Sequence, residues 1–182
     1  MGVTPPEPTE REPALTDDTR DRIRDLASRF DDPRSALLPA LYTAQEQIGY
    51  LPQEAVQEVA SVLQLPCAEV GAVASFYTMF YKRPVGQHVI GVCRTLSCAL
   101  LGAESLLDYL SQKLDVKVGE TTSDGRFTLR EVECLGACDM APAMMVDDTY
   151  YGNLTEEKLD EILSILGWTG GEDTGPPDES RD

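Results

Sequence analysis

The spacing of hydrophobic residues changes along the chain, and this change divides it into two parts. Before residue 84, apolar side chains recur three and four positions apart, as they do on one face of a helix. The pattern opens with Ile23, Leu26, Ala27 and Phe30. After Pro84 the apolar runs become short and partly alternate with polar residues, as in β-strands. The sequence therefore predicts a helical N-terminal part and a C-terminal part that contains a sheet.

Four short helices are expected in the first part. The second helix covers about residues 35–48, and Pro39 inside it implies an early kink or a late start. A third helix follows Pro52, and a fourth opens near Pro66, because proline suits the first turn of a helix. Four such helices in succession predict a small bundle over residues 19–83.

Residues 84–168 are expected to form a mixed sheet with helices. The predicted order is a strand at 87–93, a helix at 98–114, strands at 116–118, from Phe127 and at 143–150, and a last helix capped by Thr155. A strand–helix–strand unit implies a parallel pair with a right-handed crossover. This order is typical of a thioredoxin-like layer. The predicted fold class is therefore α+β, with an N-terminal helical bundle followed by a thioredoxin-like domain with a mixed β-sheet.

The two ends of the chain differ from the rest in composition. Residues 1–18 hold four prolines and few large apolar side chains, and residues 169–182 are similar, so both are predicted to be disordered acidic tails. The formal net charge of −17 disfavours nucleic acid as a partner. No apolar run reaches the length of a membrane span, so no direct membrane insertion is expected. Residues 1–18 do not resemble a targeting segment, which favours a bacterial cytoplasmic protein.

Four of the five cysteines form two pairs. Cys93 and Cys98 have four residues between them, and Cys134 and Cys138 have three. Each pair begins where a predicted strand ends, and loops that follow neighbouring strand ends can converge on one site. We therefore predict that the four thiols meet. The fifth cysteine, Cys67, stands alone in the helical part and is expected to be a small buried hydrophobic residue.

Four converging thiols suit several kinds of centre. A 2Fe–2S cluster takes four cysteine thiolates, and two pairs on two loops match that requirement, although a 4Fe–4S cluster takes four as well. Structural zinc also binds four thiolates with spacings near these. Thiol–disulfide exchange is disfavoured by the lack of a C-x-x-C motif. A Rieske centre needs two histidines, and the chain has only His88, which we expect to be structural or exposed.

Residues beside the cysteines favour an anionic centre. Cys98 is expected at a helix N-terminus, which stabilises a thiolate. Gly136 can take a positive φ angle and turn backbone N–H groups toward sulfur. Arg94 adds a positive charge nearby, and Pro142 stiffens the end of the loop. The sequence contains no nucleotide-binding glycine motif and no serine–histidine–acid set, so we expect electron transfer, with no complete active site on this chain.

Five stretches in order are similar to one known family. SALLPALYTAQEQIGYLPQEAVQEVASVLQLP, VASFYTMF, GVCRTLSCALLGAESLLDYL, ECLGACDMAP and YYGNLTEEKLDEIL resemble the small 2Fe–2S subunit of respiratory complex I, NADH:quinone oxidoreductase. The resemblance covers roughly residues 35–166. It implies a thioredoxin-like ferredoxin domain after the helical domain, and one 2Fe–2S cluster on Cys93, Cys98, Cys134 and Cys138.

The same resemblance implies a role and partners. The family's cluster exchanges single electrons with FMN on a partner flavoprotein, which also binds NADH, so FMN and NADH are not expected on this chain. The implied partners are that flavoprotein and the other subunits of the hydrophilic arm, at the inner face of the cell membrane. The alternatives are the equivalent subunit of an NAD-linked hydrogenase or formate dehydrogenase, a free-standing thioredoxin-like ferredoxin, and a zinc-stabilised interaction module.

Overall fold

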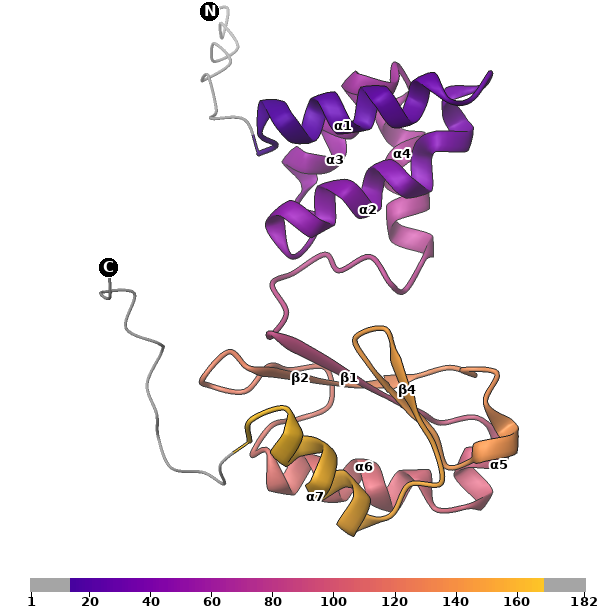
Figure 1. The fold of residues 1–182 in the computed structure, drawn as a ribbon, viewed down its shortest axis with the longest axis vertical. Helices are drawn as coiled ribbons and strands as arrows, with labels where there is room; N and C mark the ends of the chain where they lie inside the picture. The colour runs from indigo at the N-terminus through magenta and orange to yellow at the C-terminus, as the bar shows by residue number, and fades with distance from the viewer. Residues whose placement is uncertain (1–13, 169–182) are drawn as a thin grey trace, which may run out of the picture. The chain divides into compact units, whose positions relative to one another are not determined.

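The chain is built from two compact units. A computed structural model describes residues 14–168, and the division falls between Pro84 and Val85. Each unit buries a hydrophobic core of its own. Figure 1 shows four helices in the first unit and a sheet with helices in the second. Within the described residues, no helix combines the length and the apolar character needed to cross a membrane.

The first unit, which we call the helical unit, confirms the four predicted helices. They are α1 (Asp17–Ser28), α2 (Leu37–Ile48), α3 (Gln53–Leu63) and α4 (Cys67–Phe76). Their apolar faces meet in one core that includes Ile23, Leu41, Val59 and Val70. Burial of these faces stabilises helices that would be marginal alone, because isolated helices of this length barely form in water.

The helical unit begins earlier than the sequence predicted. Leu15 is buried, Thr16 caps α1 by accepting a hydrogen bond from the Thr19 N–H at 3.2 Å, and Glu58 of α3 accepts one from the Ala14 N–H at 2.6 Å. The prediction that the acidic tail extends to residue 18 is therefore wrong for residues 14–18. The rest of that tail, residues 1–13, and the C-terminal one, residues 169–182, lie outside the described residues.

Of the two outcomes expected at Pro39, the structure has the late start. A short 3₁₀ turn, η1 (Pro33–Ala36), precedes α2, and α2 then begins at Leu37. Pro39 lies in the first turn of α2, where a backbone N–H has no partner within the helix, so its missing N–H costs little.

The second unit, which we call the ferredoxin-like unit, contains a four-stranded mixed sheet in the order β2-β1-β3-β4. Strands β1 (His88–Cys93) and β2 (Phe127–Val132) are parallel, as predicted, and β3 (Met144–Val146) pairs antiparallel with β1. Strand β4 (Thr149–Tyr151) completes a hairpin with β3. The edge strands carry little of the pairing, and β1 is central.

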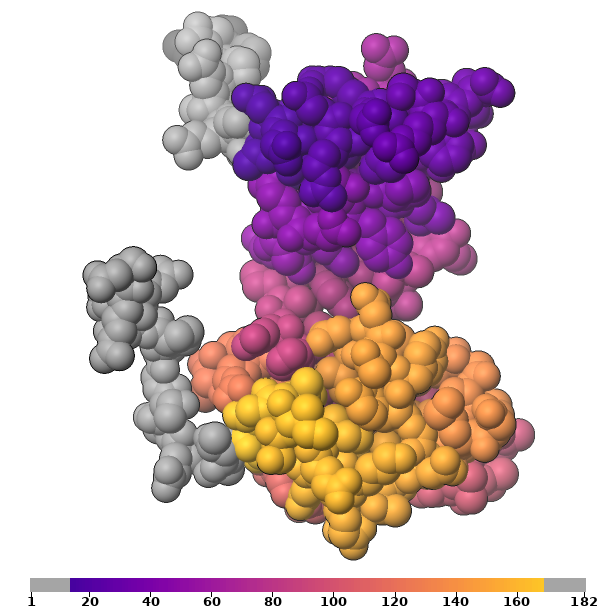
Figure 2. Space-filling model, viewed as in Figure 1, coloured from indigo at the N-terminus to yellow at the C-terminus, as the bar shows by residue number. Residues whose placement is uncertain are grey.

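Three helices accompany this sheet. They are α5 (Leu96–Leu100), α6 (Ala103–Lys113) and α7 (Glu156–Ile165). Figure 1 shows α6 and α7 on the same face of the sheet, and Figure 2 shows α7 and the β3–β4 hairpin as adjoining parts of one surface of the unit. The core between sheet and helices contains Ile90, Leu110, Phe127 and Leu159.

Three predicted elements of this unit differ from the structure. The helix expected at 98–114 is two helices, because a turn at Leu101 and Gly102 separates α5 from α6. Residues 116–118 form no strand: Val116 is buried, but the segment is a loop. The strand expected at 143–150 is the β3–β4 hairpin, with Asp147 at a positive φ of 52° in its turn.

Candidate metal centre

The four paired cysteines come from two segments that leave the sheet at the same end. Cys93 is the last residue of β1, and Cys98 lies in α5 directly after it. In the parallel register Cys93 faces Val132, the last residue of β2, so the segment that carries Cys134 starts beside Cys93. Cys138 opens a short 3₁₀ turn, η2 (Cys138–Met140), in the same segment. This is the convergence of neighbouring strand ends that the sequence predicted.

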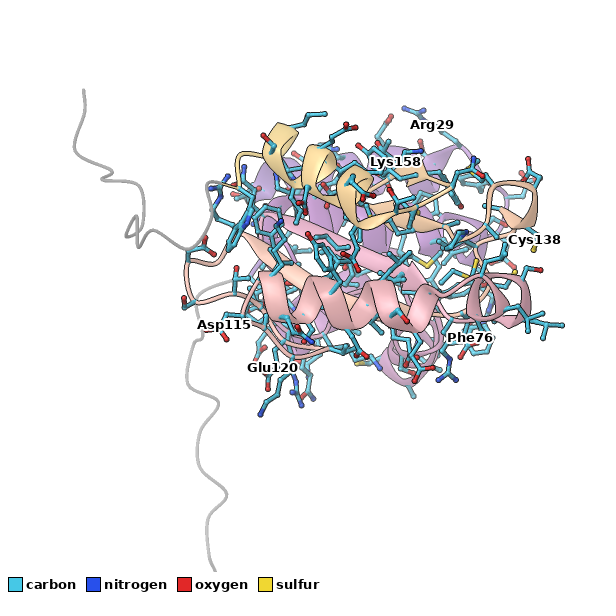
Figure 3. All side chains as sticks on the ribbon, turned by 90° about the horizontal axis from the view of Figure 1, so that it is seen from below. Arg29, Phe76, Asp115, Glu120, Cys138 and Lys158 are labelled. Atoms are coloured by element: carbon cyan, nitrogen blue, oxygen red, sulfur yellow. The ribbon has the colours of Figure 1, made fainter. Side chains whose placement is uncertain are left out.

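The interactions among these thiols are uneven. Cys93 and Cys98 are both buried, and their side chains interact directly by a hydrogen bond. Cys138 is close enough to Cys98 for its charge to act on that thiol, whereas Cys134 and Cys138 are both exposed. Figure 3 shows Cys138 at the end of the unit where α5 lies. Across residues 14–168, no three or more histidine, cysteine or acidic side chains are arranged to hold a single metal ion.

Hydrogen bonds lower the pKa of the Cys93 thiol. Burial acts to raise this pKa, but the Thr95 hydroxyl and the backbone N–H groups of Leu135 and Thr95 together outweigh it. The Thr95 hydroxyl lies 3.2 Å from the Cys93 sulfur. These donors are arranged to stabilise negative charge on this sulfur, which is what a metal-bound thiolate requires.

The pKa of Cys98 is raised instead. Burial is the largest cause, and charge on Cys93 and Cys138 adds to it, against a hydrogen bond from the Ala143 backbone. The predicted stabilisation of a Cys98 thiolate by a helix N-terminus therefore does not decide its pKa, since α5 has only five residues. Thiolates gathered here oppose one another's ionisation, and bound iron would reverse that effect by adding positive charge. The donor set thus fits an iron–sulfur centre.

The second cysteine segment is shaped by its backbone. Gly136 takes a φ of 73°, as the sequence predicted, and its N–H lies 3.3 Å from the Cys134 sulfur. The segment is also tied down, because the Met140 carbonyl accepts a hydrogen bond from the Asn153 N–H at 2.6 Å and the Pro142 carbonyl accepts one from Leu154 at 3.1 Å. Cys134 and Cys138 are thereby held on a braced loop.

Arg94, the predicted positive charge beside the site, is engaged by two carboxylates. Its guanidinium lies 2.9 Å from Glu133 and 3.4 Å from Glu131, and both carboxylates act to raise its pKa. The arginine thus links the segment after β1 to the end of β2 and the residue beyond it. Its charge is shared with these carboxylates and is not available to the sulfurs alone.

The remaining sequence candidates lie apart from the thiols or play other parts. Cys67 is exposed at the first residue of α4, in the helical unit, so the expectation of a buried residue is wrong: the first turn of α4 turns this side chain outward. His88 is structural, since its Nδ1 lies 2.8 Å from Asp147 of the β3–β4 turn. Trp168 packs its ring against Phe127, with centroids 6.1 Å apart.

The sequence analysis missed the donors that surround Cys93. Thr95, Leu135 and Ala143 supply a hydroxyl and backbone N–H groups to the sulfurs. Only Thr95 left a usable signal, as a hydroxyl residue two positions after a cysteine at a predicted strand end. Backbone donors leave no trace in residue types.

Curated relatives resemble most of the chain. Both of those described here are named as E subunits of an NADH-quinone oxidoreductase. The one from Rhizobium meliloti (strain 1021), which carries the number 2, is 46% identical over 144 residues, which are 79% of this chain and 86% of the relative. The one from Escherichia coli (strain K12) is 40% identical over 144 residues, 79% of this chain and 87% of the relative.

A solved structure supports the same fold. A chain of an NAD+-reducing [NiFe]-hydrogenase in the H2-reduced state superposes with a TM-score of 0.63 at 26% sequence identity. The match covers 71% of the present chain but only 22% of the hydrogenase chain.

The family resemblance seen in the sequence is confirmed by a model of a whole protein family. Residues 23–167 match the model described as thioredoxin-like [2Fe-2S] ferredoxin, and this range includes both cysteine pairs and all but the start of the helical unit. With that coverage and relatives of 40% identity and above, the chain belongs to the thioredoxin-like [2Fe-2S] ferredoxin family.

Proposed function

We propose that this chain is the electron-transfer subunit of an NADH:quinone oxidoreductase. It carries one 2Fe–2S cluster, held by Cys93, Cys98, Cys134 and Cys138. The observation that carries the proposal is the contact between the buried thiols of Cys93 and Cys98 at the end of β1, with the charge of Cys138 acting on Cys98. The names of the relatives support the assignment to this class of complex.

The residues of the chain have three tasks in this function. When bound, a 2Fe–2S cluster supplies a one-electron couple, which suits an exchange with a flavin that holds two electrons. The four cysteines hold the irons, two thiolates at each iron. Burial of Cys93 and Cys98 limits the access of water to one side of the site. The Thr95 hydroxyl and nearby backbone N–H groups stabilise charge on sulfur and thereby set the potential.

The electron donor proposed for this chain is a flavoprotein that binds NADH and FMN. This flavoprotein and the other hydrophilic-arm subunits would keep the chain peripheral to the inner face of the cell membrane. No complete active site is proposed on the chain itself, because it serves as one station in the transfer of electrons. The relatives are both named as one subunit of a larger oxidoreductase, which supports membership of such an assembly.

A second candidate is the equivalent subunit of an NAD+-reducing hydrogenase. The superposition on the hydrogenase chain, with a TM-score of 0.63, favours it. Isolation of the native complex separates the two candidates by its activity. Quinone reduction by NADH supports the first candidate, whereas hydrogen-dependent reduction of NAD+ supports the second.

The cluster and its ligands are tested on the anaerobically purified full chain. We expect about two irons and two acid-labile sulfides per chain, with an EPR signal in the reduced state. Cys98→Ser and Cys134→Ser should abolish or distort that signal. Cys67→Ser is the matched control, since Cys67 is an exposed cysteine of the helical unit, and its signal should stay unchanged. A colourless protein with one zinc per chain would refute the cluster.

A further inference from the structure

The short helix that carries Cys98 exposes three leucines. Leu96 and Leu100 lie one helical turn apart in α5, and Leu101 ends it; their exposed fractions are 74%, 77% and 60%. We call Leu96, Leu100 and Leu101 the α5 face. Single exposed leucines are ordinary, but three within six residues form an apolar patch of the kind that marks an interaction site. The buried Cys98 lies between them in sequence, so the α5 face adjoins the proposed cluster.

An acidic hollow lies beside the α5 face. It has a volume of about 450 Å³, and its lining includes Ala99 of α5, Cys93 at the end of β1, and the carboxylates of Glu104, Glu131 and Glu133. Arg94 is the cation in the lining, and it is already paired with Glu131 and Glu133. Three carboxylates against one guanidinium leave the hollow with a formal charge of −2. A lysine or arginine from another molecule would complement it.

The charge of the whole unit limits what can dock there. Residues 85–168 contain fourteen acidic and six basic residues, a formal charge of −8, and the full chain carries −17. A second copy would bring a strongly acidic body against an acidic hollow, which like-charge repulsion disfavours. The complementary occupant is a different protein with an apolar patch beside a basic side chain.

We propose that the α5 face and the acidic hollow together form the docking surface for the flavoprotein that exchanges electrons with the cluster. This inference rests on the proposed function. The partner places apolar side chains against the three leucines and a lysine or arginine in the hollow. Docking there brings the partner against Cys93 and next to Cys98, so the electron crosses the shortest stretch of protein that this unit offers. Figure 3 shows α5 and Cys138 at this same end of the unit.

The test measures binding of the cluster-loaded full chain to the purified flavoprotein subunit of its own complex. Leu100→Asp should weaken binding at least about tenfold, as truncation of a central apolar contact does. Leu96→Asp is a second variant of the same face. Ile165→Asp is the matched control, because Ile165 is 81% exposed but lies in α7, outside the α5 face. All three variants should keep the wild-type EPR signal.

The hollow is tested separately by charge. Glu104→Lys should weaken binding and flatten the dependence of affinity on salt, because it places a positive charge where the partner's cation would sit. Glu104→Gln should give a smaller effect in the same direction. Wild-type affinity that does not change with salt would remove the charge complementarity from the proposal.

The outcomes separate this inference from the proposed function. If both leucine variants bind the flavoprotein like the wild type, the docking surface is wrong while the cluster and its role stand. If these variants only break up a dimer of this chain, a second copy is the occupant and the proposal is overturned. If the wild-type chain holds no cluster or does not bind the flavoprotein, the proposed function itself fails.

Discussion

At the scale of single residues, Thr95 shows a local preference being overridden. It occupies the N-cap position of α5, where a threonine hydroxyl ordinarily accepts a hydrogen bond from the helix backbone. No such bond is formed, and the hydroxyl lies 3.2 Å from the Cys93 sulfur. A metal-bound thiolate has no proton, so in the loaded protein the hydroxyl must be the donor. The residue then stabilises charge on a ligand at the expense of capping its own helix.

This contact predicts a change of reduction potential. Thr95→Val removes the donor while keeping the shape, and should make the potential more negative because the reduced cluster carries more negative charge. A bond stronger by about 1 kcal/mol in the reduced state corresponds to roughly 40 mV for a one-electron couple. Redox titration followed by EPR measures the shift. Thr95→Ser is the control and should stay near the wild type; an equal shift in both variants would show that the hydroxyl is not the cause.

At the scale of elements, the sequence predicted best where one local pattern persists. The four helices of the helical unit each bury an apolar stripe, so their period survives in the sequence, and Pro52 and Pro66 mark two of the starts. The parallel pairing of β1 with β2 also followed from element order, because a strand, a helical crossover and a strand leave few alternatives.

Prediction failed where tertiary contacts decide the structure. Val116 has the apolar character of a strand residue, but it is buried in a loop without a strand partner. The α5–α6 break contradicts a helical pattern that runs on through Leu101, because the α5 face stays exposed instead of joining the core. The β3–β4 turn is formed by Asp147 and Asp148, which lack the asparagine–glycine signal of a tight hairpin.

The candidate site was predictable in its ligands but not in their surroundings. The cysteine spacing and the positions of the strand ends are enough to point to convergence. The opposite pKa shifts of Cys93 and Cys98 depend on burial and on donors from distant segments, such as Leu135 and Ala143. The exposure of Cys67 follows from which side of α4 meets the core, which its residue type does not reveal.

One contact between elements gives a prediction about stability. The guanidinium of Arg126, next to β2, donates to the carbonyls of Leu166 at 2.9 Å and Gly167 at 2.7 Å, beyond the last turn of α7. These carbonyls have no partner within the helix, and a cation there also complements the helix dipole. Arg126→Ala should lower the free energy of unfolding by about 1–3 kcal/mol. Urea unfolding followed by Trp168 fluorescence measures it.

Arg126→Lys is the matched control for this contact. Lysine keeps the charge but cannot form the two parallel bonds, so its loss should be intermediate. Gly167→Ala tests the same place from the other side, because an added Cβ would lie 2.5 Å from the guanidinium and the φ of 82° disfavours alanine. If Arg126→Ala costs less than about 0.5 kcal/mol, the contact is an ordinary surface interaction.

At the scale of the whole molecule, the two units have separate means of stabilisation. The helical unit relies on its own core and on ties such as Arg20 to Glu58, 2.8 Å apart. The ferredoxin-like unit has a second core, and all four proposed ligands belong to it. Binding of a metal centre stabilises the folded state that holds the ligands together, since the unfolded chain does not preform the site. The cluster should therefore stabilise one unit and not the other.

Removal of the cluster tests this separation. The single tryptophan of the chain, Trp168, reports on the ferredoxin-like unit, whereas most α-helical residues of the described chain lie in the helical unit. In the apo full chain the transition seen by Trp168 should move to lower temperature, by about 4–8 °C for each 1 kcal/mol lost. The main transition in far-UV circular dichroism should stay in place. Arg20→Ala is the reciprocal control: it should lower the helical transition and leave the tryptophan transition unchanged. Equal movement of both transitions on loss of iron would mean that the two cores unfold as one cooperative body, because a ligand held by one unit lowers the transition of another only when the two melt together.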